Sequence, residues 1–514
     1  MSQSGKKVIV VGAGVHGISA AKTFKDFGYQ VTVYERQSDL GGVWAPENHW
    51  PGMRTPPQLD VEYPVPAANV YAYLRAYAEE QGVAPLMKFQ TDVVKAVPVY
   101  AKEAGGDAGP PTGWALHLRH QPSGREFTDA CDVLIVAVGL YNKPNIPQYP
   151  GLDAFKAGGG QVLHTQQLWA ALKKLPDCAA AGVGLGALVA GKRVVVVGNG
   201  KSGDDVTHLI ADSGAAKSVT QICRSRTWVV PRFFPGGLHF KYPLCTRLGC
   251  ALLKPLHPPV WPFSWLHSLL AWGNWRMVEA QIKMVQPLAQ IKAVPRDAIE
   301  RSIQGAVHIE PGSPGNTLFK MVADGRITQV DGEFGGFGAG VAQLASGATL
   351  EADLVILATG YDRSISFLPP EITGKILGPK GELDMYLKIY PQEVGGSSLF
   401  ITGWDVGLYP PLEADLASRW AVEMVEGRIK VTPDQMRAYN KHLHDWADAN
   451  FTPSTALDIK RGFAHSFSID HMDDMLYSMG GNWRSLTWGE YLTLYTAPIS
   501  AGLYGKAMAA IKTK

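Results

Sequence analysis

The sequence predicts an α/β protein with two dinucleotide-binding domains of the Rossmann type, the second inserted into a discontinuous first one. The prediction depends on two similar stretches, KKVIVVGAGVHGISAAKTF at Lys6–Phe24 and KRVVVVGNGKSGDDVTHLI at Lys192–Ile210. Each has a basic pair, a run of β-branched residues typical of a buried parallel strand, the pattern GxGxxG, and a helix-compatible stretch. The 514 residues allow two or three domains at the usual ~150 residues per domain.

The first glycine-rich turn contains Gly12, Gly14 and Gly17, between a predicted strand and a predicted helix. Gly12 permits the tight turn, Gly14 lets the backbone approach a pyrophosphate, and Gly17 lets the helix pack closely on the strand. Glu35 ends the next strand, where a carboxylate can accept hydrogen bonds from ribose hydroxyls and repel a 2′-phosphate. This site is therefore expected to hold a dinucleotide with a free ribose, FAD or NAD.

The second turn repeats the arrangement with Gly198, Gly200 and Gly203. No carboxylate ends its next strand, Ser218–Ile222, which is followed instead by Arg224 and Arg226. A guanidinium binds phosphate oxygens with two parallel hydrogen bonds and stays charged, so this arrangement predicts a site for NADPH. Lys201 adds a cation beside the phosphates. A protein with a second site selective for NADPH is expected to pass a hydride to a flavin in the first.

The domain boundaries follow from this assignment. We expect the first part of the FAD-binding domain at residues 1–165 and an NADPH-binding domain at 166–350, with an apolar insertion at about 233–290. The second part of the FAD-binding domain and a C-terminal helical extension are expected at 351–514. Further strands are predicted at Val31–Tyr34, Val133–Val138 and Leu354–Ala358.

Composition excludes several classes of protein. The 48 Lys and Arg nearly balance the 46 Asp and Glu, which removes the electrostatic case for a nucleic-acid binder. Five cysteines are too few and too scattered for a disulfide framework, so a reducing compartment is favoured. Zinc-type cysteine spacing is missing, and no metal is expected. The N-terminus has no signal-peptide pattern, so a cytoplasmic location is expected.

An uncharged stretch at Pro255–Trp275, PLHPPVWPFSWLHSLLAWGNW, has spanning length. Its four prolines and two histidines argue against a transmembrane helix. Three alternatives remain open for the surrounding segment, Phe233–Trp275: ordinary core packing, an apolar lid over the flavin cleft, or contact with a membrane surface through its tryptophans. The last would make the protein peripheral to a membrane.

Further motifs occur in an order that resembles the class B flavin-dependent monooxygenases, which are the flavin-containing monooxygenases and their Baeyer–Villiger relatives. The motifs are GGVW at Gly41–Trp44, WPGMRT at Trp50–Thr55, VGLYNKPNIP at Val138–Pro147, LATGY at Leu357–Tyr361, and a late helix at Pro411–Gly427. The resemblance therefore spans roughly Lys6 to Gly427.

The turns and the resemblance together predict the residues that bind FAD and NADPH. They are Gly12, Ala13, Gly14, Val15, His16, Gly17, Glu35, Arg36, Gly42, Val43, Trp44, Met53, Thr55, Val93, Val138, Gly139, Gly198, Asn199, Gly200, Lys201, Ser202, Gly203, Arg224, Arg226, Thr359, Gly360 and Tyr361. The catalytic side chains that the resemblance implies are Arg54, Thr55 and Gln58.

The chain departs from the family pattern at several positions. Pro56 and Pro57 stand where relatives have Asn, or Asp in the Baeyer–Villiger branch. Proline offers neither a side-chain donor nor a backbone N–H, so Thr55 or Gln58 would have to replace the lost contact near the oxygen site. The FxGxxxH element is also distorted, with Ala157 in place of its Gly, and we expect His164 to have a positioning role between the domains.

The resemblance implies that NADPH reduces FAD, that O₂ then forms a C(4a)-(hydro)peroxyflavin, and that one oxygen atom enters a small lipophilic substrate. Because no Asp follows Arg54, a nucleophilic nitrogen or sulfur is favoured over Baeyer–Villiger insertion into a ketone. Two other classes stay open. A flavin disulfide reductase would use a cysteine pair such as Cys245 and Cys250, and a flavin-binding scaffold or uncoupled NADPH oxidase would reflect the lost Asn. Neither the substrate's identity nor the oligomeric state follows from the sequence.

Overall fold

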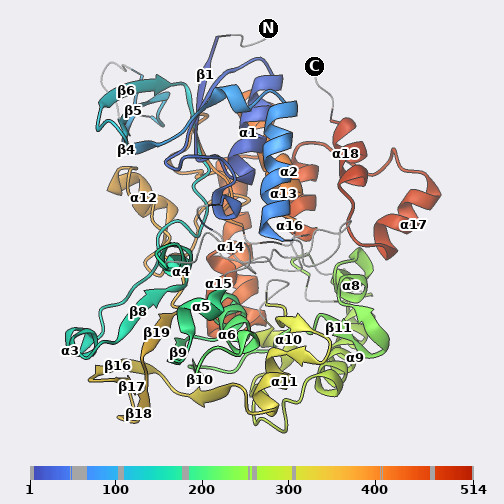
Figure 1. Cartoon of the computed structure of the whole chain (residues 1–514). Coiled ribbons are helices and arrows are strands. Elements are labelled where there is room, and N and C mark those ends of the chain that lie inside the picture. Colours follow the sequence, from blue (N-terminus) through green and yellow to red (C-terminus); the bar gives the residue numbers. More distant parts are fainter. Residues whose placement is uncertain are drawn as a thin grey trace.

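The computed structural model of the chain describes residues 5–46, 48, 66–101, 109–175, 184–252, 255–257, 263–303, 308–405, 407, 409–462 and 469–511. Two parallel five-stranded sheets organise these residues, each with a glycine-rich turn after its central strand. Figure 1 shows the first sheet and its helices in the upper half of the molecule and the second sheet in the lower half.

The first sheet has the order β20-β7-β1-β2-β3. Its strands are β1 (Lys7–Val11), β2 (Gln30–Tyr34), β3 (Met87–Lys88), β7 (Val133–Val136) and β20 (Leu399–Ile401). Helices α1 (Val15–Asp26), α2 (Ala67–Glu80) and α13 (Pro410–Val425) stand beside one another against it. An antiparallel meander is formed by β4 (Thr91–Val99), β5 (Gly113–His120) and β6 (Glu126–Cys131). Because β20 and α13 come from late in the chain, the first domain is discontinuous, as predicted.

The second sheet has the order β15-β10-β9-β19-β8. Its strands are β8 (Gln161–His164), β9 (Arg193–Val197), β10 (Ser218–Cys223), β15 (Thr328–Asp331) and β19 (Leu354–Leu357), and α6 (Lys201–Ser213) follows β9. β8 and β19 pair with this sheet although they lie outside the range 166–350 predicted for it. Both joints between the domains therefore fall within a few residues of these strand ends, and we propose 161–357 as the extent of the second domain.

The insertion and the C-terminal extension are mainly helical. The insertion contains β11 (Phe233–Phe234), β12 (Leu238–His239), α7 (Lys241–Leu244), α8 (Arg247–Ala251) and α9 (Phe263–Val285), and α10 (Ile299–Ser302) follows it. The extension contains α14 (Pro433–Asn450), α15 (Pro453–Lys460), α16 (Ile469–Ser478), α17 (Trp488–Thr496) and α18 (Ala501–Ala509). None of the helices in the described part of the chain combines the length and apolarity that crossing a membrane would need.

Candidate functional site

The two glycine-rich turns have the same local geometry. A Cβ on Gly12 would lie 2.5 Å from the carbonyl oxygen of Ala137, and one on Gly17 would lie 1.9 Å from that of Gly12. The first and third positions therefore exclude any side chain, because strand and helix approach too closely. A Cβ on Gly14 would meet only the Cα of Gly42, at 3.8 Å. The middle glycine thus borders open space at the N-terminus of α1, where a pyrophosphate fits.

The second turn repeats these distances. A Cβ on Gly198 would lie 2.8 Å from the oxygen of Ala358, and one on Gly203 would lie 2.2 Å from that of Gly198. A Cβ on Gly200 would meet nothing within 4 Å. The residues at both turns therefore fit a dinucleotide, since each leaves a cradle at a helix N-terminus that a larger residue would fill.

Glu35 lies at the end of β2, as predicted, and its side chain is buried. Its Oε2 accepts a 2.7 Å hydrogen bond from the backbone N–H of Ala13, and its Oε1 accepts one of 2.9 Å from Gln37. These bonds fix the carboxylate beside the first turn. Each oxygen keeps a second lone pair, which is what a ribose with both hydroxyls free needs.

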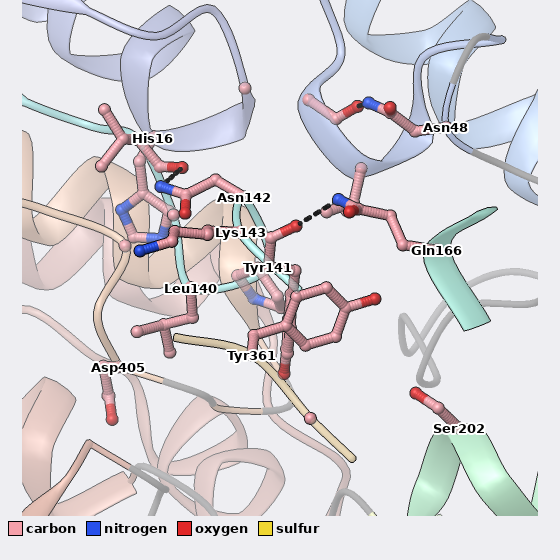
Figure 2. Close-up of a pocket in the computed structure, with 18 of the residues that line it drawn as sticks. His16, Asn48, Leu140, Tyr141, Asn142, Lys143, Gln166, Ser202, Tyr361 and Asp405 are labelled. Atoms are coloured by element: carbon pink, nitrogen blue, oxygen red, sulfur yellow. Dashed lines mark hydrogen bonds between the residues drawn. The ribbon is translucent and has the colours of Figure 1, made fainter. Parts of the chain in front are cut away.

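A cavity of about 850 Å³ joins the two turns. Gly12 and Gly14 line one part of it, and the start of α6, Gly200 to Gly203, lines another. Figure 2 shows His16 and Asp405 on one side of this cavity and Ser202 of α6 on the other. The insertion contributes apolar wall residues, including Leu244 and Trp275. Two dinucleotides bound at the turns would therefore share one continuous cavity.

The two segments that connect the domains, one after β8 and one after β19, form part of the cavity wall. His164, at the end of β8, is 1% exposed, and its Nε2–H donates a 3.0 Å hydrogen bond to the carbonyl oxygen of Gly360. Burial lowers the pKa of His164, so its imidazole is neutral near pH 7. The ring packs edge-on against Tyr361, which packs in the same way against Tyr141. These contacts place His164 at the junction of the two sheets, where a positioning role was expected.

Asp405, which follows β20 in the sequence, lines the cavity and was not predicted from the sequence. Its Oδ1 lies 2.8 Å from Lys388 Nζ and its Oδ2 lies 3.3 Å from His471 Nε2, and all three side chains are buried. Leu387 and Lys388 have φ of 51° and 53°, a left-handed conformation that non-glycine residues rarely adopt and that concentrates at functional sites. The strained backbone at Leu387 and Lys388 therefore lies where it directs the Lys388 ammonium group toward Asp405.

His16 occupies the variable position before the third glycine of the first turn. Its ring packs so closely on Gly403 that a Cβ there would lie 3.1 Å from it. Burial lowers the pKa of His16 to about 4, and the nearby Asp405 carboxylate opposes this shift. His16 is therefore a neutral imidazole at physiological pH, in the part of the cavity beside the first turn.

The two arginines predicted to read a 2′-phosphate have different surroundings. Arg224 is exposed at the end of β10. Arg226 donates from Nη1 to Gln329, and its Nε lies 2.7 Å from Asp331 Oδ1 on the neighbouring strand. Neither arginine lines the cavity, which is consistent with the adenosine end of a dinucleotide extending outward from the turn. Arg224 is therefore the arginine that is more accessible to a 2′-phosphate.

The structure places most of the predicted residues at this cavity. Those that line it are Gly12, Gly14, Val15, His16, Glu35, Arg36, Gly42, Val43, Trp44, Val93, Val138, Gly139, Gly200, Lys201, Ser202, Gly203, Gly360 and Tyr361. Those that are described but do not line it are Ala13, Gly17, Gly198, Asn199, Arg224, Arg226 and Thr359. The remaining predicted residues, Met53, Arg54, Thr55 and Gln58, lie outside the described residues.

The cysteine pair that a disulfide reductase would need is poorly suited to that role. Cys245 and Cys250 are buried free thiols, and neither lines the cavity. Burial raises the pKa of Cys245 to about 12 and that of Cys250 well above its ordinary value. Because the thiolate is the reactive form, these cysteines are inert near pH 7. No group of His, Cys, Asp and Glu side chains suited to a metal occurs among the described residues.

Comparisons with known proteins agree with this geometry. Residues 6–235 match the family model described as pyridine nucleotide-disulphide oxidoreductase. Flavin-containing monooxygenase 3 of Macaca mulatta is 25% identical over 483 residues, which cover 88% of this chain and 80% of the relative. The Arabidopsis thaliana protein named "Probable flavin-containing monooxygenase 1" is 26% identical over 527 residues, covering 93% and 92%.

The fold is also similar to solved structures. An oxidized steroid monooxygenase bound to NADP superposes with a TM-score of 0.60 at 20% identity, covering 92% of this chain and 97% of the other. The similarity therefore concerns the fold, over nearly the whole length of both chains. Over most of its length the chain is therefore similar to flavin-containing monooxygenases, and its fold of two dinucleotide-binding domains is similar to that of the NADP-bound steroid monooxygenase.

Proposed function

We propose that this chain uses NADPH and FAD to insert one atom of O₂ into a lipophilic small molecule, at a nucleophilic nitrogen or sulfur. The observation that carries the proposal is the cavity of about 850 Å³ lined by both glycine-rich turns. Two dinucleotides held there would bring the nicotinamide close to the flavin within one cavity. FAD, when bound, supplies the hydride acceptor and the oxygen chemistry.

The protein's own residues contribute binding, orientation and water exclusion. The N-terminal N–H groups of α1 and α6 would hold the two pyrophosphates, and Glu35 would hold the ribose of FAD. His16 and Asp405 border the part of the cavity beside the first turn. Apolar side chains of the insertion, such as Leu244 and Trp275, favour a lipophilic substrate and keep the reacting atoms dry.

Heteroatom oxygenation is preferred to Baeyer–Villiger insertion because no Asp follows Arg54 in the sequence. A ketone requires a deprotonated, charge-stabilised oxidant, whereas an amine or sulfide attacks the protonated form. The prolines at 56 and 57 favour an uncoupled oxidase as the alternative outcome, because the family resemblance implies a hydrogen-bonding side chain at this point of the sequence and proline has none.

The test is a product balance on the FAD-loaded protein. NADPH and O₂ consumption, H₂O₂ and oxygenated product are measured with N,N-dimethylaniline, thioanisole and phenylacetone. N-oxide or sulfoxide equal to the NADPH consumed supports the proposal, and an ester from phenylacetone replaces it with Baeyer–Villiger chemistry. NADPH consumption matched by H₂O₂ with all three probes would identify an oxidase. If the protein did not oxidise NADPH at all, both the monooxygenase and the oxidase hypotheses would be contradicted.

We also propose that the protein contacts lipid through an exposed apolar surface formed by α9 and α17. Trp265, Leu269 and Trp272 of α9 are 64%, 56% and 60% exposed, and Trp488 and Leu492 of α17 are 92% and 66% exposed. Both helices contact α8, α9 through a hydrogen bond from His267 to Ala251. Tryptophan on an uncharged helix face is typical of lipid headgroup boundaries.

Flotation with phosphatidylcholine vesicles tests this contact. The double variant W265S/W488S should bind vesicles at least tenfold more weakly than the unchanged protein. Y73S, which removes an aromatic residue that is 55% exposed on α2, is the matched control and should bind normally. Equal binding by the double variant, or no binding by the unchanged protein, would refute the proposal.

A further inference from the structure

The segment that follows β10 is tied to the second glycine-rich turn. Asn199, inside that turn, donates a 2.7 Å hydrogen bond from Nδ2 to the carbonyl oxygen of Ser225. Ser225 lies between the two arginines, Arg224 and Arg226. In a Rossmann fold, the residues at the end of this second strand are the ones that contact the adenosine ribose and its 2′-phosphate. Both arginines therefore belong to the segment that a 2′-phosphate would approach.

Arg226 is engaged by two side chains of the neighbouring strand β15. Its Nε lies 2.7 Å from Oδ1 of Asp331, and its Nη1 donates a hydrogen bond to Oε1 of Gln329. The Arg226 side chain is 16% exposed and that of Asp331 is 66% exposed, so the carboxylate is the outer partner of the pair. Asp331 pairs in register with Cys223, the last residue of β10. The ion pair therefore lies at the carboxyl edge of the sheet, next to Arg224.

A chain of hydrogen bonds connects this ion pair to the second turn. Nε2 of Gln329 donates a 2.7 Å bond to Oε1 of the buried Gln221. Gln221 in turn donates from Nε2 to the carbonyl oxygen of the turn's first glycine at 3.2 Å and to Asp204 Oδ1 at 2.8 Å. The other oxygen of Asp204 lies 2.8 Å from Nε2 of His308. Gln329 therefore holds one end of the Arg226 guanidinium against the body of the sheet, while Asp331 occupies the side that is nearer to solvent.

The two arginines consequently differ in what they can offer a phosphate. Arg224 is exposed. The charge of Arg226 is compensated by the carboxylate of Asp331, and a guanidinium that is already paired with one anion attracts a second anion only weakly. Although the sequence has two cations after β10, the structure leaves one of them, Arg224, to provide the attraction for a 2′-phosphate.

We propose that Asp331 withholds Arg226 from the 2′-phosphate of NADPH, so that Arg224 alone binds this phosphate and the protein also accepts NADH as a hydride donor. NADH, a proton and FAD would give NAD⁺ and FADH₂, the same two-electron transfer that NADPH performs. Asp331 is then a residue that sets cofactor specificity, and it does so by limiting the preference for NADPH. The inference rests on the proposed function in one respect, because it takes the second turn as the site of the nicotinamide nucleotide.

The variant D331A removes the carboxylate and leaves Arg226 able to turn toward a phosphate. It is expected to fold, because an ion pair with a largely exposed partner contributes little stability. R226A and D331A/R226A show whether any gain depends on Arg226. E351A is the matched control, because Glu351 is 75% exposed and lies 2.8 Å from Nη1 of Arg193, which begins β9 at the opposite, amino edge of the same sheet.

Calorimetric titration of the FAD-loaded protein with NADP⁺ and NAD⁺ tests the proposal, because these two probes differ only in the 2′-phosphate. The unchanged protein should bind NADP⁺ about tenfold to a hundredfold more tightly than NAD⁺, the contribution of one charged hydrogen-bonding group. D331A should bind NADP⁺ about tenfold more tightly still and NAD⁺ as before. E351A should match the unchanged protein, and D331A/R226A should match R226A. Mixing the unchanged protein with NADH in the absence of O₂ should bleach the flavin absorbance.

Several outcomes would overturn the inference while leaving the proposed function intact. Unchanged NADP⁺ binding in D331A, or equal changes for NADP⁺ and NAD⁺, would show that Asp331 does not act on the 2′-phosphate. A gain that persisted in D331A/R226A relative to R226A would show that it does not act through Arg226. Failure of saturating NADH to reduce the flavin would exclude NADH as a hydride donor. If instead the unchanged protein bound neither nucleotide, the proposed function itself would fail.

Discussion

Lys388 Nζ lies 2.8 Å from Oδ1 of Asp405, and the two side chains are 4% and 7% exposed. Removing one partner from a buried ion pair leaves an uncompensated charge, which is far more destabilising than losing the pair as a whole. K388M is therefore expected to lower the free energy of unfolding by about 3–5 kcal/mol, and K388M/D405N to recover part of that loss. Urea unfolding of the FAD-loaded protein measures both.

The control for this pair is K441M, which breaks the exposed pair between Lys441 and Asp445 on α14. It should change stability little, because surface ion pairs are screened by solvent. If K388M and K441M lowered the free energy of unfolding by equally small amounts, the hypothesis that the Lys388–Asp405 pair stabilises the fold would be wrong. A loss of FAD in K388M at full stability would instead indicate that Asp405 acts directly on the cofactor.

Arg224 and Arg226 are expected to contribute differently to the choice between NADPH and NADH. Arg224 is exposed at the end of β10, whereas Arg226 already binds Gln329 and Asp331. R224A should raise the KM for NADPH about tenfold or more, the cost of a charged hydrogen bond, and leave that for NADH unchanged. R226A should affect the two cofactors similarly, because it loosens the end of the sheet. Steady-state kinetics with NADPH and NADH test this prediction. If R226A alone lost the preference for NADPH, then Arg226 and not Arg224 would be the residue that binds the 2′-phosphate.

The glycines of the first turn should separate folding from FAD binding. A side chain on Gly12 would collide with the oxygen of Ala137 at 2.5 Å, whereas one on Gly14 would enter the open cradle. G14V is therefore expected to fold but to purify without FAD, and G12V to be destabilised whether or not FAD is present. Thermal unfolding and the flavin absorbance of the purified proteins test this pair. Full FAD occupancy in G14V would place the pyrophosphate elsewhere.

Much of this architecture could be predicted because it depends on local pattern. Strands β1 and β9, their turns and Glu35 follow from β-branched runs, GxGxxG and the position of an acidic residue. The buried pairs could not be predicted in this way, since each joins distant segments. Asp204 and His308 are 104 residues apart, and no periodicity links them. The one available signal was Asp405, which comes shortly after the end of β20 (Leu399–Ile401) and Gly403, near the carboxyl edge of the sheet.

The boundaries between the two domains were also difficult to predict, because they too depend on pairing between segments that are distant in sequence. β8 and β19 pair with the second sheet through parallel ladders, and a parallel strand gives no turn signal that says which sheet it joins. Both strands are short apolar runs that would suit either domain. The pairing of Leu354 with both Val194 and Gln161 shows that β19 and β8 belong to the second sheet.

Glu310 should make the stability of the protein depend on pH near neutrality. This carboxyl is 3% exposed, and it accepts hydrogen bonds from Gln286 Nε2 at 2.8 Å and from the N–H of Phe319 at 3.1 Å. Burial, with a smaller contribution from the neighbouring Asp204, raises its pKa to about 7, while those hydrogen bonds act in the opposite direction. The folded state therefore holds a proton that the unfolded state releases at lower pH.

The sign of the effect follows from this difference. Because the pKa of Glu310 is higher in the folded state, its contribution to stability is complete below pH 4.5 and is lost as the pH rises through about 7. The loss is on the order of 3 kcal/mol at 1.4 kcal/mol per pH unit. E310Q keeps a neutral side chain, and its amide can donate to the Oε1 of Gln286, which otherwise has no partner among the described residues. Relative to E310Q, the unchanged protein should lose stability between pH 5 and pH 8 in urea titrations, whereas parallel curves would mean that Glu310 ionises normally.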